Sequence, residues 1–63
     1  MTVYCILCND HIEGVSLDGL HHAERVMEAE KQEDFQDLQR QHNYTLSNYE
    51  SFFRWHIEEV RVI

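Results

Sequence analysis

The N-terminal part of the chain has a mainly apolar run followed by an alternating run of apolar and polar residues, both typical of β-strands rather than helices. Residues 2–8 form a run rich in β-branched and aromatic side chains, and residues 11–17 alternate between apolar and polar positions. Short runs of these kinds, separated by turn-forming residues, predict two strands that pair as a hairpin. The second run ends at Asp18-Gly19.

From residue 19 onward the apolar positions recur with the period of an α-helix. The residues on this stripe are Leu20, Ala23, Val26, Met27, Phe35 and Leu38. The spacing predicts one acidic helix over 19–42. Asp18 is its expected N-cap, because a carboxylate there can accept from the free backbone N–H groups of the first turn.

The C-terminal third contains a second helical pattern with an aromatic face. Ser47-Asn48-Tyr49-Glu50 has the spacing of a capping box, in which the first and last side chains satisfy each other's backbone donors. An amphipathic helix over 47–60 is therefore predicted. The chain then ends in the β-branched Val62 and Ile63, so residues 61–63 either extend this helix or form a third strand beside residues 3–6, and the β-branched ending favours the strand.

Together these elements predict a small α+β fold, with an N-terminal zinc-knuckle β-hairpin followed by a two-helix hairpin. At 63 residues the chain forms a single domain, 1–63, with a metal-binding lobe over 1–22. A domain of about 60 residues buries only about 60% of its unfolded surface. Chains of this size often need an additional stabilising cross-link, and a bound metal ion is one candidate.

The two cysteines are the first candidates for metal ligands. Cys5 and Cys8 are spaced C-x2-C, and a disulfide between them would close too small a loop to remove much unfolded-state entropy. A redox pair normally lies at a helix N-terminus, whereas this pair lies in a predicted strand. Metal binding is the favoured interpretation, and a pair of ordinary buried thiols is the alternative.

The spacing C-x2-C-x12-H, formed by Cys5, Cys8 and His21, resembles the first three ligands of the two-Cys-two-His zinc finger. The resemblance covers residues 3–22 and lacks the closing histidine. It implies a Zn²⁺ ion held by Cys5, Cys8 and one or both of His21 and His22. His11 and His56 are alternative sources of the fourth ligand.

Acidic residues are the second candidate for function. The chain has 12 Asp and Glu against 5 Lys and Arg, a net charge of −7, and half of the acids lie within residues 24–37. On a helix they form either a solvated outer face or a docking surface for a partner protein with a basic surface. The predicted partner-binding residues are Glu28, Glu30, Glu33, Asp34, Asp37 and Trp55.

The favoured function is therefore a small acidic zinc-binding interaction module, a regulator or inhibitor and not an enzyme. A nucleic-acid-binding zinc finger is the first alternative, disfavoured because acids would face phosphates. A metal-dependent nuclease is the second, because Asp10-His11-Ile12 with Asn48 and His56 resembles the His-Asn-His motif. A metal-free homodimer, with the helix pairs forming a four-helix bundle, is the third.

The expected compartment is the cytoplasm. No apolar run approaches the roughly 18 residues of a membrane span. Residues 1–8 lack the basic head of a signal peptide. Thiols that bind a metal also imply a reducing environment.

Overall fold

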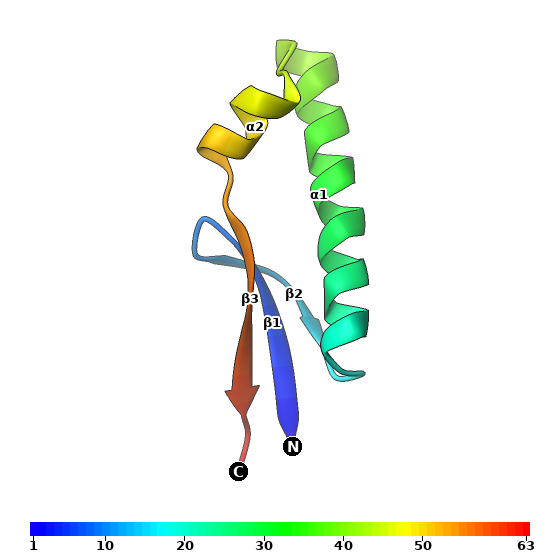
Figure 1. The fold of residues 1–63 in the computed structure, drawn as a ribbon, viewed down its shortest axis with the longest axis vertical. Coiled ribbons are helices and arrows are strands. Elements are labelled where there is room, and N and C mark those ends of the chain that lie inside the picture. The colour runs from blue at the N-terminus through cyan, green and yellow to red at the C-terminus, as the bar shows by residue number, and fades with distance from the viewer.

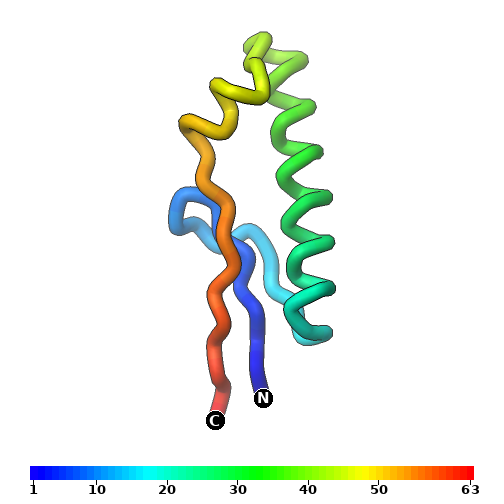
Figure 2. Tube along the Cα trace, in the orientation of Figure 1, coloured from blue at the N-terminus to red at the C-terminus, as the bar shows by residue number.

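The computed structural model describes residues 1–63 and has a three-stranded antiparallel sheet and two helices (Figure 1). In chain order the elements are β1 (Thr2–Cys8), β2 (His11–Ser16), α1 (Leu20–His42), α2 (Leu46–Phe52) and β3 (Trp55–Arg61). The strand order is β2-β1-β3, so the last strand pairs with the first. The two ends of the chain consequently lie side by side (Figure 2). The predicted α+β class is confirmed.

The predicted hairpin is also confirmed, and a two-residue turn closes it. Asn9 and Asp10 both have positive φ, 51° and 68°, as the two central residues of a type I′ turn require. The Asn9 side chain then joins this turn to the far end of the chain. Its Nδ2 donates to the Phe52 carbonyl, and its Oδ1 accepts from the Arg54 backbone N–H, both at 3.0 Å.

The long acidic helix forms as one continuous element, α1, as predicted. Its N-cap is Gly19 with φ 100°, and no side chain caps it, so the prediction of Asp18 as N-cap is wrong by one residue. A left-handed φ of this size favours glycine, which has no Cβ to clash. Asn43 ends the helix in the left-handed conformation and donates its N–H to the Gln39 carbonyl. No helix of the structure has both the length and the apolar character needed to cross a lipid bilayer.

The predicted helix over 47–60 is wrong in its second half. The helix α2 ends at Phe52, and residues 55–61 form the strand β3. Aromatic and apolar residues there fit a helical period, but Ile57 and Val60 are also β-branched, which suits a strand. Pairing along the whole free edge of β1, from Thr2–Arg61 to Cys8–Trp55, satisfies backbone groups that a longer helix would leave without partners. The third strand, expected only for residues 61–63, therefore begins six residues earlier.

The start of α2 also differs from the predicted capping box. Thr45 is the N-cap, and its side chain accepts from the Asn48 backbone N–H at 3.1 Å. Ser47 consequently lies in the first turn instead of capping it. Thr45 and Asn48 are three residues apart, like the predicted pair Ser47 and Glu50, but they lie two residues earlier in the chain.

The sheet has two faces that differ in what covers them, and residues directly opposite each other on paired strands share a face. The inner face, which α1 covers, contains Tyr4, Ile6, Cys8, His11, Gly14, Ser16, Trp55, Ile57 and Glu59. The outer face contains Val3, Cys5, Leu7, Ile12, Val15, His56, Glu58 and Val60. The core lies between α1 and the inner face, where Ile6 and Ala23 are fully buried, and a fully buried Tyr49 extends it beneath α2.

Candidate functional site

A hollow of about 490 Å³ opens between α1, the hairpin turn and the start of β3. We call it the acidic hollow because five of its lining side chains are carboxylic acids, Glu13, Glu30, Glu33, Asp34 and Asp37. The other lining residues are Cys8, Asn9, His11, Phe53 and Trp55. Three separate parts of the chain therefore deliver acids and aromatic rings to one place.

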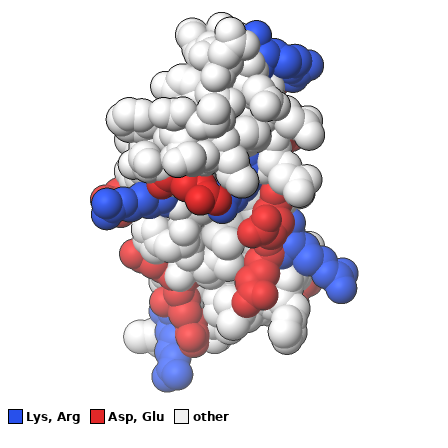
Figure 3. Space-filling view, turned by 45° about the horizontal axis from the view of Figure 1, so that its top comes forward, with Lys and Arg blue, Asp and Glu red and all other residues white.

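The negative charge of the hollow is not balanced by the protein itself. No Lys or Arg lines it, and Asp37 is the only one of its five acids with an ion-pair partner, Arg40. Figure 3 shows acidic atoms across the middle of the molecule, beneath the helical end, with most Lys and Arg atoms toward its outline. A cationic group of another molecule would find unpaired carboxylates there.

A chain of hydrogen bonds centred on Tyr49 positions two of the lining residues. The Trp55 indole Nε1–H donates to the Tyr49 hydroxyl at 2.7 Å, and that hydroxyl donates to Asp34 Oδ2 at 2.8 Å. Burial, and secondarily the bond to Asp34, raises the pKa of Tyr49 far above its usual range, so the phenol keeps its proton. Because the three residues come from α2, β3 and α1, the network holds these elements together at the edge of the hollow.

The rings around Tyr49 complete this support. Phe35 of α1 meets Tyr49 edge-on at 5.3 Å between centroids, and Phe53 stacks on it at 4.8 Å. Both arrangements are favourable for aromatic quadrupoles. Phe53 also lines the hollow, so the aromatic cluster is continuous with its wall.

Burial, and secondarily nearby carboxylates, raise the pKa of two groups in the hollow. Burial raises the pKa of Glu30, and the nearby carboxylates Glu13 and Glu33 raise it further. Burial also raises the pKa of the Cys8 thiol, with Asp34 and Glu13 adding to the effect. Cys8 is therefore a neutral thiol at neutral pH, whereas nucleophilic or metal-binding cysteines are thiolates.

The Glu30→Gln variant is expected to be more stable than the wild type at pH 7, by a few degrees in Tm. A carboxyl whose pKa is raised on folding stabilises the protein below its unfolded pKa, and that contribution is lost as the pH rises through the folded pKa. The wild type should gain stability as the pH falls from 7 toward the pKa of Glu30, and the variant should gain less. Thermal unfolding followed by circular dichroism at several pH values measures both effects.

The control for this prediction is Glu24→Gln, which removes the same charge from an exposed site on α1 outside the hollow. It should leave the pH dependence close to that of the wild type. Equal behaviour of the two variants would show that net charge, and not crowding in the hollow, sets the response.

The four predicted zinc ligands do not come together in this structure. Cys5 is on the outer face and Cys8 on the inner face, because residues three apart on a strand point to opposite sides. His22 contacts Ser16, which is paired with Tyr4, four residues or roughly 13 Å along β1 from Cys8. No group of three or more His, Cys, Asp or Glu is arranged to hold a metal ion. Zinc binding stays a prediction from the sequence, which metal analysis of the purified protein can test.

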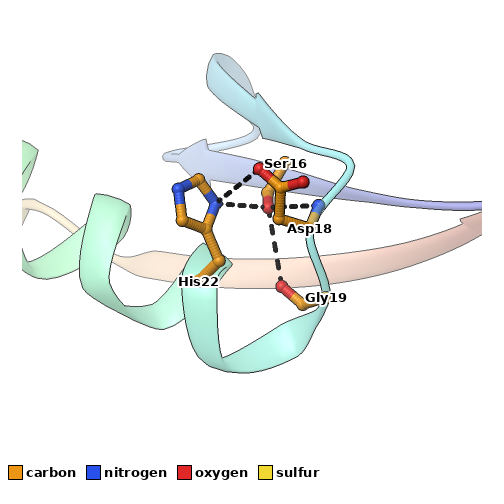
Figure 4. Close-up of polar contacts among 4 residues, drawn as sticks. All are labelled: Ser16, Asp18, Gly19 and His22. Carbon is orange, nitrogen blue, oxygen red and sulfur yellow. Dashed lines mark hydrogen bonds and ion pairs between the residues drawn. The ribbon is translucent and has the colours of Figure 1, made fainter.

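His22 has a structural contact instead, in the turn between β2 and α1 (Figure 4). Its Nδ1 is 2.7 Å from the hydroxyl of Ser16, which is buried and also accepts from the Asp18 backbone N–H at 3.2 Å. Asp18 Oδ2 approaches the same ring nitrogen, at 3.9 Å. A catalytic triad uses opposite ring nitrogens for its serine and its acid. These contacts therefore tie the start of α1 to the sheet, while His21 is exposed on the same turn.

The residues that resemble a nuclease motif are also separated. His11 lines the acidic hollow on the inner face, whereas His56 is on the outer face with its Nε2 3.3 Å from Glu58 Oε1. Asn48 is used in the cap of α2. The structure therefore does not assemble these three side chains around a common point.

Five of the six predicted partner-binding residues line the acidic hollow, all except Glu28. Glu28 lines a second hollow, which Lys31 shares. Sequence analysis missed Glu13 and Phe53 as members of this group. The bulge in β2 turns Glu13 toward α1, and no sequence signal marks it beyond the neighbouring Gly14.

Comparisons of the chain with protein-family models, with curated proteins and with solved structures find no match. Function is therefore inferred from the geometry and charge of the acidic hollow.

Proposed function

We propose that the protein is a small acidic interaction module, a regulator or inhibitor that docks on the basic surface of a partner protein through the acidic hollow. The observation that carries the proposal is the set of unbalanced carboxylates from α1 and β2 in one concave site. Folding partly buries Glu30 and brings it near Glu13 and Glu33, and both effects raise the pKa of its carboxyl, burial the more. A cation from a partner offsets the like-charge part of this effect on binding.

The lining of the hollow suits an arginine or lysine side chain in particular. Carboxylates form strong charge-assisted hydrogen bonds with guanidinium and ammonium groups. Trp55 and Phe53 offer ring faces on which a cation and its apolar stem can rest. A nucleic acid is disfavoured as the partner, because its phosphates would meet the same carboxylates.

Binding can be followed through the fluorescence of Trp55, the only tryptophan of the chain. The probe is a short arginine-rich peptide, titrated at low ionic strength. We expect a saturable change in Trp55 fluorescence that weakens as salt is added, because screening reduces attraction between exposed charges. A single-stranded DNA oligonucleotide, the probe for the nucleic-acid alternative, should leave the fluorescence unchanged.

Two double variants separate the hollow from the overall charge. Glu13→Gln with Glu33→Gln removes two charges from the hollow, and Glu24→Gln with Glu28→Gln removes two from the rest of α1. The first pair should weaken peptide binding by about tenfold or more, equivalent to about 1.4 kcal/mol. The second pair should change it much less. Equal losses would mean that the peptide senses only net charge, which would refute docking at the hollow.

A further inference from the structure

The outer face of the sheet has no covering element in this chain. The helix α1 contacts all three strands on the inner side, and α2 packs beyond the end of the sheet (Figure 1). Opposite residues on this face include the pairs Val3–Val60 and Cys5–Val15. A sheet that is apolar on both sides normally has both sides buried.

The outer face is apolar and open to solvent over part of its area, whereas Leu7 on its central strand is buried, at 7% exposed. Ile12 is 66% exposed, Val15 54% and Val60 41%, although they flank the half-buried Val3 and Cys5. Each is a β-branched residue whose exposure to water forgoes hydrophobic stabilisation. A contiguous patch of this kind, in contrast to scattered apolar residues, is typical of an interaction surface.

Both edges of the sheet are poorly suited to pairing with another chain. On the β3 edge, Glu58 and Glu59 occupy the middle of the strand, so two copies pairing antiparallel there would bring like charges together. On the β2 edge, the bulge opposite Ile6 and Leu7 disturbs the ladder. The face, and not an edge, is therefore the surface left for association.

We propose that a second copy of this chain covers the outer face, forming a two-fold symmetric, face-to-face dimer. Among the acidic residues of the strands, only Glu58 is on this face, and His56 lies beside it. The remaining acids of the strands and those of the acidic hollow are on the other side. Glu58 is thus the only acid that a two-fold contact would bring near its own copy, and a self-complementary surface needs few like charges because each patch meets an identical one.

The size of the face sets the strength expected of the dimer. Strands of six or seven residues, spaced about 4.8 Å apart, make a face of roughly 23 by 14 Å. Two such faces have a flat area of roughly 640 Å², and the uneven surface of the side chains raises the accessible area to roughly 1,000 Å² in total, at the lower limit for specific interfaces. We therefore expect a dimer with a dissociation constant in the micromolar range.

Sedimentation equilibrium tests the dimer on the intact chain. The mass should rise from the 7.6 kDa of one chain toward twice that value as the concentration increases to about 1 mM. In the Val15→Lys variant the charge lies on the outer face, and the mass should stay that of a monomer. Leu46→Lys is the matched control, since Leu46 is 56% exposed on α2, away from this face, and it should dimerise like the wild type.

Cross-linking gives an independent measurement. Cys5 is on the outer face and Cys8 on the inner face, so a short thiol cross-linker should join two Cys8→Ser chains through Cys5, and Val15→Lys should abolish the product. A wild type that is monomeric up to about 1 mM would overturn the proposal and leave the face to another protein. A dimer that persists in Val15→Lys would also overturn it, because the contact would then lie elsewhere.

Discussion

Replacing Tyr49 by alanine is expected to lower the free energy of unfolding by about 3–5 kcal/mol, the range for removal of a buried aromatic side chain. Tyr49 is fully buried and joins α1, α2 and β3 through its ring contacts and its two hydroxyl hydrogen bonds. A 63-residue domain has a total stability of about 3–9 kcal/mol. The variant should therefore lose about a third or more of the total stability and unfold at a much lower urea concentration than the wild type, as urea titration followed by circular dichroism would show.

Two further variants identify which part of Tyr49 is responsible. Tyr49→Phe keeps the ring but leaves Asp34 and the Trp55 Nε1–H without this partner, at a cost of about 1–3 kcal/mol. Tyr44→Ala removes a tyrosine that is only half-buried in the link between the helices, and it should cost less than Tyr49→Ala. If Tyr49→Ala unfolded at the wild-type urea concentration, the junction would not depend on this ring.

The elements that sequence predicts well are those set by local patterns. The hairpin follows from the β-branched and aromatic run before the Asn9-Asp10 turn and the alternating run after it, and α1 from a sustained helical period. The strand β3 depends on pairing with β1, about fifty residues away in the chain. Its apolar residues fit a helix and a strand equally well, so only the free edge of β1 decides between them.

The candidate site was predictable in composition but not in orientation. Hydrophobic periodicity assigns charged residues to the outer side of a helix, yet Glu30 lies over the inner face of the sheet. Gly14 makes this possible, because a Cβ at that position would lie 3.3 Å from Glu30 Oε1. A half-buried acid that faces the sheet contradicts the simple pattern, which is what functional sites often do.

The zinc-finger resemblance shows the limit of spacing alone. C-x2-C places both sulfurs on one ion only if the chain bends into a knuckle between them. Here both residues lie in the regular strand β1, whose two-residue repeat separates Cys5 from Cys8. Both cysteines are free thiols in the structure.

The two proposed surfaces lie on opposite sides of the molecule and do not compete. A dimer through the outer face leaves an acidic hollow exposed on each far side, next to α1. Such a dimer would present two binding sites for basic side chains that face away from each other, so each site could bind a separate partner molecule.

Replacing Ile6 by alanine is the second variant expected to have a large effect. Removing a buried isoleucine costs about 2–5 kcal/mol, and we expect the upper part of this range. Ile6 is fully buried in the central strand, directly opposite Gly14 on one side and Ile57 on the other. Gly14 has no side chain that could move into the cavity, so nothing there replaces the contacts that Ile6 makes.

The matched control for this prediction is Ile63→Ala, the same chemical change at a fully exposed residue beyond the end of β3. Surface substitutions of this kind usually change stability by less than about 0.5 kcal/mol. Urea titration of both variants at low concentration, where association is negligible, measures the difference. A similar midpoint for the two variants would show that the packing between α1 and the inner face contributes little to the stability of the fold. A much lower urea midpoint for Ile6→Ala than for Ile63→Ala would show that the packing of Ile6 contributes strongly to the stability of the fold.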